Sequence, residues 1–420
     1  MSLALFLLLA ACATGGPAVG AEPPAAAPAG LPPAPADAPP DVVPAPTPSA
    51  PDLAVLRDGN AAFALDLYRN LAARGPGNVF LSPVSISLAL AMTRAGATGE
   101  TGVEMDRTLH LDLPQDCLHP AFGALLAALA AEGPWTLAIA NRLWGQQGFA
   151  FEAPFLEVTR TWYGAGIEAL DFRDPEGARG TINAWVAEHT AGRIPELIPP
   201  RVLNAATTLV LTDAVWFKGT WVEPFDPALT SPEPFTTDTG EKVTVPLMYR
   251  EGKVRWGQAK GATLLALPYA GDRLEMLLAL PEAPDGLASL EASLTPAIIA
   301  AWEAALHPAK VMIWLPRFRL STAYDLVEPL STLGMPRAFG AGADFSGISR
   351  AAPLTLGAVV HQAWVAVDEV GTEAAAATAV AVTRSGGPKP TFRADRPFLF
   401  LIRDRQTGAI LFLGRCARPG

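Results

Sequence analysis

Hydrophobic positions follow two patterns along the chain, and the patterns come in a definite order. Over Leu53–Leu71 and Cys117–Ala131, apolar residues recur at helical spacing, which predicts amphipathic helices. Later runs such as Thr207–Phe217 and Ala262–Tyr269 are continuous or alternating and end at turn residues, which predicts strands. Because helices come first and strands mostly follow, without a repeating strand–helix unit, we predict the α+β class.

Residue types at the ends of several runs indicate further helices. Ser82, followed by proline, is typical of a helix start. The pattern also predicts helices over Thr181–Thr190 and Tyr324–Leu333, the second stopped by Gly334. Helices are therefore expected on both sides of the strand-rich middle of the chain.

A long segment after Val367 fits neither pattern clearly. It lies between the strand-like runs Ala363–Val367 and Phe398–Ile402, and a further apolar run, Leu354–Val360, precedes it. Helix propensity favours a helix at its alanines, whereas alternation favours a strand with Glu373 on one face and no charge on the other. The uncharged face holds Thr372, Ala374, Ala376, Thr378, Val380 and Val382. The third interpretation is a flexible Ala-rich loop, and long loops in compact domains are usually functional or disordered.

The first twelve residues are typical of an export signal. Leu3–Ala11 is an unbroken apolar run that is too short to span a bilayer. Leu9–Cys12 resembles a bacterial lipoprotein cleavage box, in which Cys12 is lipidated after cleavage. Met1 and Ser2 carry no positive charge, so an ordinary secretory signal with an incidental Cys12 stays open. The resulting hypothesis is an exported protein: an outer-membrane-anchored lipoprotein in the periplasm or at the cell surface, or a secreted one.

Residues 13–51 are rich in proline and alanine and contain no Lys or Arg. Such a composition cannot bury a core, and proline-rich chains act as semi-rigid spacers. We therefore predict three parts: a signal over residues 1–12, a disordered linker over residues 13–51 and a folded domain over residues 52–420. A membrane contact is expected only through the lipid anchor.

Charge and motif content exclude several function classes. The formal net charge of −10 argues against a nucleic-acid partner. The chain lacks the Gly-x-Ser-x-Gly, His-Glu-x-x-His, phosphate-loop and Rossmann motifs, and its five histidines show no metal-ligand spacing. We therefore expect no enzyme, no metal and no cofactor. Cys117 and Cys416 show no disulfide framework, and Cys416 is predicted to be a buried small hydrophobe.

Six sequence blocks resemble the serpins, a family of protease inhibitors. They are Asn78–Leu88, Thr212–Trp221, Pro316–Leu320, Leu330–Ala338, Val367–Thr378 and Phe392–Ile402. The blocks come in the family's order within residues 53–420. The resemblance implies the serpin fold: a large central, mostly antiparallel β-sheet with further sheets, eight to nine helices and a long exposed reactive-centre loop.

The resemblance also implies a mechanism. An inhibitory serpin is a single-use substrate: a protease cuts the loop and forms an acyl-enzyme, and the cut loop enters the central sheet as a new strand. The hinge of that loop corresponds to Glu369, Gly371, Thr372, Glu373, Ala374, Ala375, Ala376, Ala377 and Thr378. Trp216, Lys218 and Gly219 match the region where the loop enters the sheet. His361 matches a position beside the strands that part, and we interpret it as a satisfied core histidine rather than a pH-sensitive latch.

Two neighbouring peptide bonds compete as the site of cleavage. Arg384–Ser385 suits a trypsin-like protease, whose pocket carries an acidic residue. Counting from the hinge in the usual inhibitory register points to the bond after Ser385, which suits an elastase-like or subtilisin-like protease. The chemistry of arginine favours Arg384. The expected molecule is a monomeric serine protease inhibitor; a non-inhibitory serpin-fold binding protein and an inhibitor of cysteine proteases are the alternatives.

Overall fold

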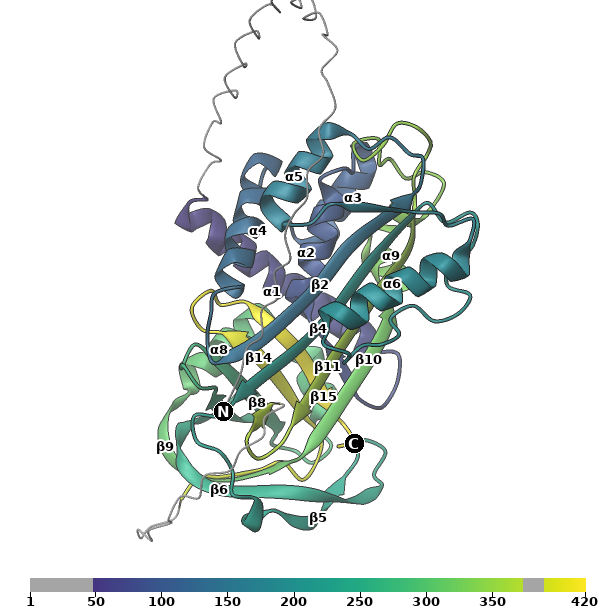
Figure 1. Cartoon of the computed structure of the whole chain (residues 1–420). Coiled ribbons are helices and arrows are strands. Elements are labelled where there is room, and N and C mark those ends of the chain that lie inside the picture. The colour runs from purple at the N-terminus through teal and green to yellow at the C-terminus, as the bar shows by residue number, and fades with distance from the viewer. Residues whose placement is uncertain (1–47, 373–388) are drawn as a thin grey trace, which may run out of the picture. The chain divides into compact units, whose positions relative to one another are not determined.

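Two β-sheets with helices packed around them form the described part of the chain, residues 48–372 and 389–420 of a computed structural model (Figure 1). The helices in this part are α1 (Ala50–Ala72), α2 (Pro83–Arg94), α3 (Gly99–Leu109), α4 (Gln115–Leu129), α5 (Ala153–Tyr163), α6 (Pro175–His189), α7 (Leu287–Ser293), α8 (Pro296–Ala305) and α9 (Val327–Leu333). Short 3₁₀ turns lie at Pro227–Leu229 and Pro336–Phe339. The arrangement confirms the predicted α+β class.

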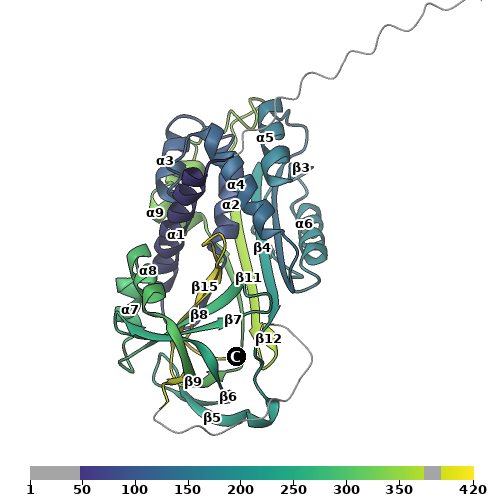
Figure 2. The same ribbon diagram turned by 90° about the vertical axis from the view of Figure 1, so that its left-hand side faces the viewer.

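A six-stranded sheet holds the segment that precedes the long Ala-rich region. Its strands are β2 (Trp135–Gln146), β3 (Ile167–Leu170), β4 (Leu209–Thr220), β10 (Phe318–Asp325), β11 (Leu356–Val367) and β12 (Gly371–Thr372). Their spatial order is β10-β11-β12-β4-β2-β3. Most neighbours are antiparallel, but β11 and β4 also pair directly and run parallel. The short β12 is antiparallel to both and lies at one end of that pair (Figure 2).

A second, nine-stranded sheet supplies most of the remaining core. It contains β1 (Val79–Leu81), β5 (Ser231–Thr236), β6 (Lys242–Ala259), β7 (Ala262–Pro268), β8 (Leu274–Pro281), β9 (His307–Pro316), β13 (Thr391–Arg393), β14 (Phe398–Asp404) and β15 (Ile410–Cys416). All residues of β8, β14 and β15 are buried, including the charged Glu275, Arg403, Asp404 and Arg415. Cys416 is buried in β15 and forms no disulfide, in agreement with the sequence-based prediction.

Helix α2 is buried and contacts both sheets. Residues Pro83–Thr93 are all buried, and α2 contacts β15 of one sheet and β2 and β4 of the other. Its alanine, serine and leucine side chains are small or apolar on every side, which suits a fully buried helix. Ser82 occupies the N-cap position as predicted, but its side chain makes no capping hydrogen bond.

The opposite face of the six-stranded sheet is covered by α6, which lies in front of β2, β4 and β11 in Figure 1. Ile182 and Val186 of this helix are buried in a cluster with Val210 of β4 and Val360 of β11. The sheet is therefore packed on both faces, and this agrees with the long apolar run predicted for β4.

Several element boundaries differ from the sequence-based prediction. Helix α1 begins at Ala50 rather than Leu53, and so before the predicted domain start at Asp52, because Ser49 and Asp52 cap each other's backbone N–H groups. The helix predicted from Tyr324 begins only at Val327, because Tyr324 pairs with the neighbouring strand as part of β10.

The two strand-like runs before the Ala-rich segment form one strand, β11. His361 and Gln362, which separate the runs in the sequence, remain in the ladder, and His361 is buried with polar partners. The hydrophobic pattern also missed α3 and α5. None of the helices in the two described ranges is long and apolar enough to cross a bilayer.

Candidate functional site

The candidate site is the seam between the parallel strands β4 and β11, with β12 inserted at one end. Gly371 pairs with Thr220, and Thr372 pairs with Gly219 of β4 and Val367 of β11. Farther along, β4 and β11 pair directly with each other, from Trp216–Trp364 to Leu209–Leu356. A chain continuing from β12 along the seam would therefore run antiparallel to both strands.

The entry of β12 into the seam depends on two glycines. A Cβ atom added to Gly371 would lie 2.1 Å from the carbonyl oxygen of Gly219 and 2.7 Å from the Cα of Thr220. A Cβ atom on Gly219 would lie 2.7 Å from the Phe217 ring and 2.9 Å from the Tyr269 ring. The close contacts at Gly371 are with backbone atoms, so β12 approaches β4 only because this position is glycine, whereas a side chain at Gly219 would displace the Phe217 and Tyr269 rings.

Thr372 is fully buried beneath this crossing. Its hydroxyl and that of Tyr269 lie 2.7 Å apart, and both side chains are completely buried. Burial raises the pKa of Tyr269 well above its usual value, so its hydroxyl stays protonated. The alternation in the sequence placed Thr372 on an inward, uncharged face, and the structure shows Thr372 pointing inward.

A tight turn joins β11 to β12. The carboxylate of Asp368 accepts hydrogen bonds from the backbone N–H groups of Val370 and Gly371, at 2.9 and 3.1 Å. Burial raises the pKa of Asp368, and these two bonds partly oppose the shift. The indole of Trp221 donates to the carbonyl of Asp368 at 3.1 Å, which fixes the turn to the chain after β4.

Glu369 anchors the turn from the other side. Its carboxylate is 5% exposed and accepts hydrogen bonds from the Arg317 guanidinium, with Nε 2.7 Å from each oxygen. The Thr230 hydroxyl donates a further bond at 2.5 Å. Burial alone would raise the pKa of Glu369, but the Arg317 and Thr230 bonds outweigh burial and hold this pKa below its usual value. Glu369 is therefore ionised and paired at neutral pH.

The residues matched to the gate lie at the end of β4 where β12 enters. Trp216 is 7% exposed and pairs across the seam with Trp364 of β11. The Arg193 guanidinium lies 6.0 Å from the Trp216 ring and 5.4 Å from the Trp364 ring, in cation–π contact with both. Lys218 is exposed, and Gly219 is the residue that faces Thr372.

His361 lies farther along the seam, on the face that contacts α2. It is fully buried, its Nδ1 is 3.0 Å from an Asp213 oxygen, and its Nε2 accepts the Ser82 backbone N–H at 3.1 Å. Asp213 also accepts a hydrogen bond from the Ser85 hydroxyl at 2.5 Å. Both ring nitrogens are satisfied, as expected for a core histidine, and His361 and Asp213 are direct partners across the seam.

Sequence reasoning named the hinge and gate residues but missed most of their partners. Tyr269 and Thr230 are distant in sequence from the groups they contact, and no local pattern marks them, whereas Asp213 belongs to the block Thr212–Trp221. Arg317, the partner of Glu369, belongs to the block Pro316–Leu320, and this block was the only sequence signal that pointed to it. The predicted residues Cys12, Glu373, Ala374, Ala375, Ala376, Ala377, Thr378, Arg384 and Ser385 lie outside the described residues.

No group of three or more His, Cys, Asp or Glu side chains within residues 48–372 and 389–420 could hold a metal ion. The site therefore consists of a parallel strand pair, a buried polar network and a hinge that has entered one end. Such an arrangement can accept a further strand.

Comparison with known proteins gives consistent results. The family described as serpin (serine protease inhibitor) matches residues 58–419. The chain is 43% identical to a leukocyte elastase inhibitor of Sus scrofa over 376 residues, which cover 87% of this chain and 99% of the relative. It is 41% identical to serpin B8 of Homo sapiens, with 87% of this chain and 99% of the relative covered.

Solved structures show the same fold. The crystal structure of Serpin48, described as a highly specific serpin of the insect Tenebrio molitor, superposes with a TM-score of 0.79 at 30% identity. The match covers 87% of this chain and 98% of the insect protein. The seam, the glycine-dependent hinge and the match over nearly the whole described region agree: the chain belongs to the serpin family of serine protease inhibitors.

Proposed function

We propose that this protein inhibits serine proteases as a suicide substrate, by inserting its cleaved loop between β4 and β11. The observation that carries the proposal is β12. Gly371 and Thr372 already occupy one end of the seam, antiparallel to both neighbours. Continued entry in the same direction would add a full strand to the six-stranded sheet.

The chemistry begins with the target protease. Its serine Oγ attacks the carbonyl carbon of the scissile bond, the peptide C–N bond breaks, and the new amino group leaves with the C-terminal part of the loop. The N-terminal part stays esterified to the protease. Insertion then competes with hydrolysis of the ester, and each inserted residue contributes about 1 kcal/mol of net hydrogen-bond stabilisation.

Two target classes follow from the two candidate bonds. Cleavage at Arg384–Ser385 fits a trypsin-like protease, and cleavage after Ser385 fits an elastase-like or subtilisin-like protease. Relatives named leukocyte elastase inhibitor support the second class, whereas the charge of Arg384 supports the first. Both classes are serine proteases, so the reaction class is the same in either case.

The direct test is incubation with trypsin and, separately, with an elastase, followed by a denaturing gel. We expect a complex that survives SDS with at least one of the two proteases. Mass spectrometry of the released C-terminal peptide identifies the bond. The peptide begins at Ser385 if the Arg384–Ser385 bond is cut, and at Gly386 if the bond after Ser385 is cut. Complete cleavage by both proteases without any stable complex would favour a non-inhibitory serpin-fold binding protein. A stable complex with a cysteine protease such as papain, and with neither serine protease, would favour an inhibitor of cysteine proteases.

We also propose that the protein is exported and held at a membrane by a lipid on Cys12. The support is the sequence: a short apolar run, the Leu9–Cys12 box and a Pro/Ala-rich spacer. In a bacterial host, wild type should incorporate labelled palmitate and sediment with membranes, and Cys12→Ser should lose both properties. Release of unlabelled wild type into the medium would instead support the ordinary secretory signal.

A further inference from the structure

A segment without regular secondary structure covers the seam on the α6 face. Residues 190–203 follow α6 and lead to β4, and we call them the seam strap. Ile194, Leu197, Ile198 and Leu203 of the strap are 5% exposed or less. They belong to one apolar cluster that also contains residues of β4 and β11.

The strap's cluster includes residues from both sides of the seam. Val210 and Ala214 come from β4, and Ala358 and Val360 come from β11. In the register of the two strands, Ala358 lies opposite Val210. Neighbouring strands are about 4.8 Å apart, so a strand inserted between them would separate these side chains by about that distance. The strap cannot keep its packing on both strands while the seam opens.

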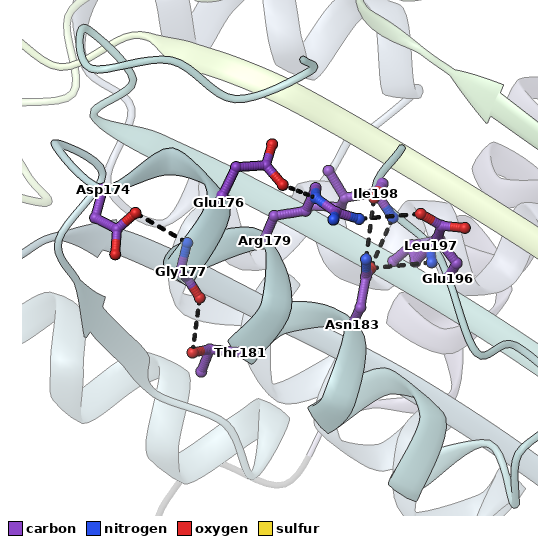
Figure 3. Close-up of polar contacts among 9 residues, drawn as sticks. All are labelled: Asp174, Glu176, Gly177, Arg179, Thr181, Asn183, Glu196, Leu197 and Ile198. Carbon is purple, nitrogen blue, oxygen red and sulfur yellow. Dashed lines mark hydrogen bonds and ion pairs between the residues drawn. The ribbon is translucent and has the colours of Figure 1, made fainter. Parts of the chain in front are cut away.

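Residues 190–192 continue directly from the end of α6 and bond its last turn. Beyond them, the buried side chain of Asn183 fastens the strap to α6 (Figure 3). Its Oδ1 accepts the backbone N–H groups of Leu197 and Ile198, at 3.1 and 2.8 Å, and its Nδ2 donates to the carbonyl of Ile198 at 3.0 Å. Asn183 is 8% exposed. An amide side chain that bonds both N–H and C=O groups of a loop replaces the pairing that a strand would provide.

A second contact between α6 and the strap is more exposed. Arg179 bonds Glu196 of the strap at 3.0 Å and Glu176 of its own helix at 2.8 Å (Figure 3). Both carboxylates are more than half exposed, so solvent weakens this ion pair. Asn183 is therefore the main polar fastening of the strap.

We propose that Asn183 is a positioning residue that sets the rate of loop insertion, because its three bonds to the strap break before the seam opens. The inference rests on the proposed function, since it assumes that the cleaved loop inserts between β4 and β11. The inference specifies how the seam is uncovered. The strap separates from α6, whereas in the alternative route α6 and the strap leave the sheet together.

The two routes predict opposite effects of removing the Asn183 amide. If the strap separates from α6, Asn183→Ala destabilises the intact state but not the transition state, and insertion becomes faster. If α6 and the strap move together, the bonds persist in the transition state and the rate is unchanged. Faster insertion also traps more protease before the ester is hydrolysed, and it shortens the lifetime of the intact protein.

Thr181→Ala is the matched control. Thr181 lies on the same helix, and its hydroxyl bonds only to Gly177 of that helix among the contacts drawn in Figure 3. Asn183→Asp is the second variant in case Asn183→Ala does not fold. It keeps the shape and an acceptor for the two N–H groups but loses the donor to Ile198.

The experiment nicks the loop with a metalloprotease, which forms no acyl-enzyme, and follows insertion by pulse-labelled hydrogen exchange of peptides from β4 and β11. We expect protection of the β4 and β11 amides to appear about tenfold faster in Asn183→Ala than in wild type. A tenfold change corresponds to an insertion barrier that is lower by about 1.4 kcal/mol. Asn183→Asp should show a smaller acceleration, and Thr181→Ala should match wild type.

Two results would overturn the inference, and they are distinguishable. Unchanged insertion rates in both Asn183 variants, with the Leu197 and Ile198 amides exchanging faster in the intact proteins, would show that α6 and the strap move together. The proposed function would survive that result. Absence of any new protection in nicked wild type would instead show that no strand inserts, and the proposed function would fail together with the inference.

Discussion

At the scale of single residues, the site depends on the absence of a side chain at Gly371. Its Cα faces the Gly219 carbonyl so closely that a Cβ atom would lie 2.1 Å from that oxygen. The hinge therefore enters the seam only if this position is glycine, although the φ angle at Gly371 itself lies outside the left-handed region.

We expect Gly371→Val to expel β12 from the seam and to convert the inhibitor into a substrate. Overpacking of this kind costs about 1–3 kcal/mol, and it also obstructs the start of insertion. The measurement is the number of inhibitor molecules consumed per protease molecule trapped. Gly166→Ala is the control, because a Cβ atom there meets nothing within 4 Å. An unchanged stoichiometry in Gly371→Val would contradict the role of the close approach.

His119 is a buried titratable group of the helical region. It is 4% exposed in α4, and its ring nitrogens bond the Tyr163 hydroxyl at 2.7 Å and Gln115 at 2.8 Å. Burial, with a smaller contribution from Arg94, lowers its pKa from 6.5 to about 4. Between these two pH values the unfolded chain binds a proton at His119 that the folded chain does not.

We therefore expect the stability that His119 contributes to be complete above pH 6.5 and to be lost as the pH falls towards 4. The full loss amounts to about 3 kcal/mol. Urea unfolding of wild type and His119→Gln at pH 7.5 and pH 4.5 measures it, and the pH dependence should be smaller in the variant. Equal pH dependence in the two proteins would assign the effect to other groups.

At the scale of elements, the turn between β11 and β12 is held by a buried pair. Glu369 has its pKa lowered from 4.5, because the Arg317 and Thr230 bonds outweigh burial. Its contribution to stability is therefore present above about pH 4.5 and is lost as the pH falls through the lower folded value. Without Arg317, burial would dominate and would raise this pKa.

We expect Arg317→Ala to destabilise the turn by about 1–3 kcal/mol at pH 7, because it leaves a buried carboxylate without its main partner. The intact variant should also form polymers or the inserted form faster on mild heating, as followed by native gel. Arg317→Lys should recover part of the loss. Arg57→Ala, which removes an exposed ion pair with Asp58, should change stability little.

At the scale of the whole molecule, the seam implies an intact state that is stable only kinetically. The six-stranded sheet contains a parallel pair, β4 and β11, that a further strand can separate and bond on both sides. The large core on either side of this sheet keeps the rest of the fold intact while that strand is missing.

We expect cleavage within residues 373–388 to raise the melting temperature by well over 10 °C, since about ten inserted residues at about 1 kcal/mol each contribute on the order of 10 kcal/mol. Differential scanning calorimetry of intact and nicked protein measures this change. Nicking within residues 13–47, which belong to the predicted linker over residues 13–51, is the control and should leave the melting temperature unchanged. A nicked protein that melts no later than the intact one would exclude an insertion mechanism.

Much of the architecture could be predicted from the sequence. The long apolar run of β4 identified a strand buried on both faces, because such a strand needs no polar face, and the runs of β8 and β14 identified strands. Boundaries failed where tertiary pairing overruled local pattern: Tyr324 joined a strand because β11 lay beside it, and His361 remained within β11 because Asp213 and Ser82 satisfied its ring.

The sequence by itself determined the family and predicted a hinge with small residues at Gly371, Thr372 and Ala374–Ala377 and two candidate cleavage bonds, because these depend on residue types in order along the chain. Only the tertiary structure decided what the hinge meets: Tyr269 beneath Thr372, Arg317 beside Glu369, and the strap tied by Asn183 over the seam. The physical reason is sequence distance. These partners are brought together by sheet pairing between segments that lie far apart in the chain, and no local periodicity encodes such contacts.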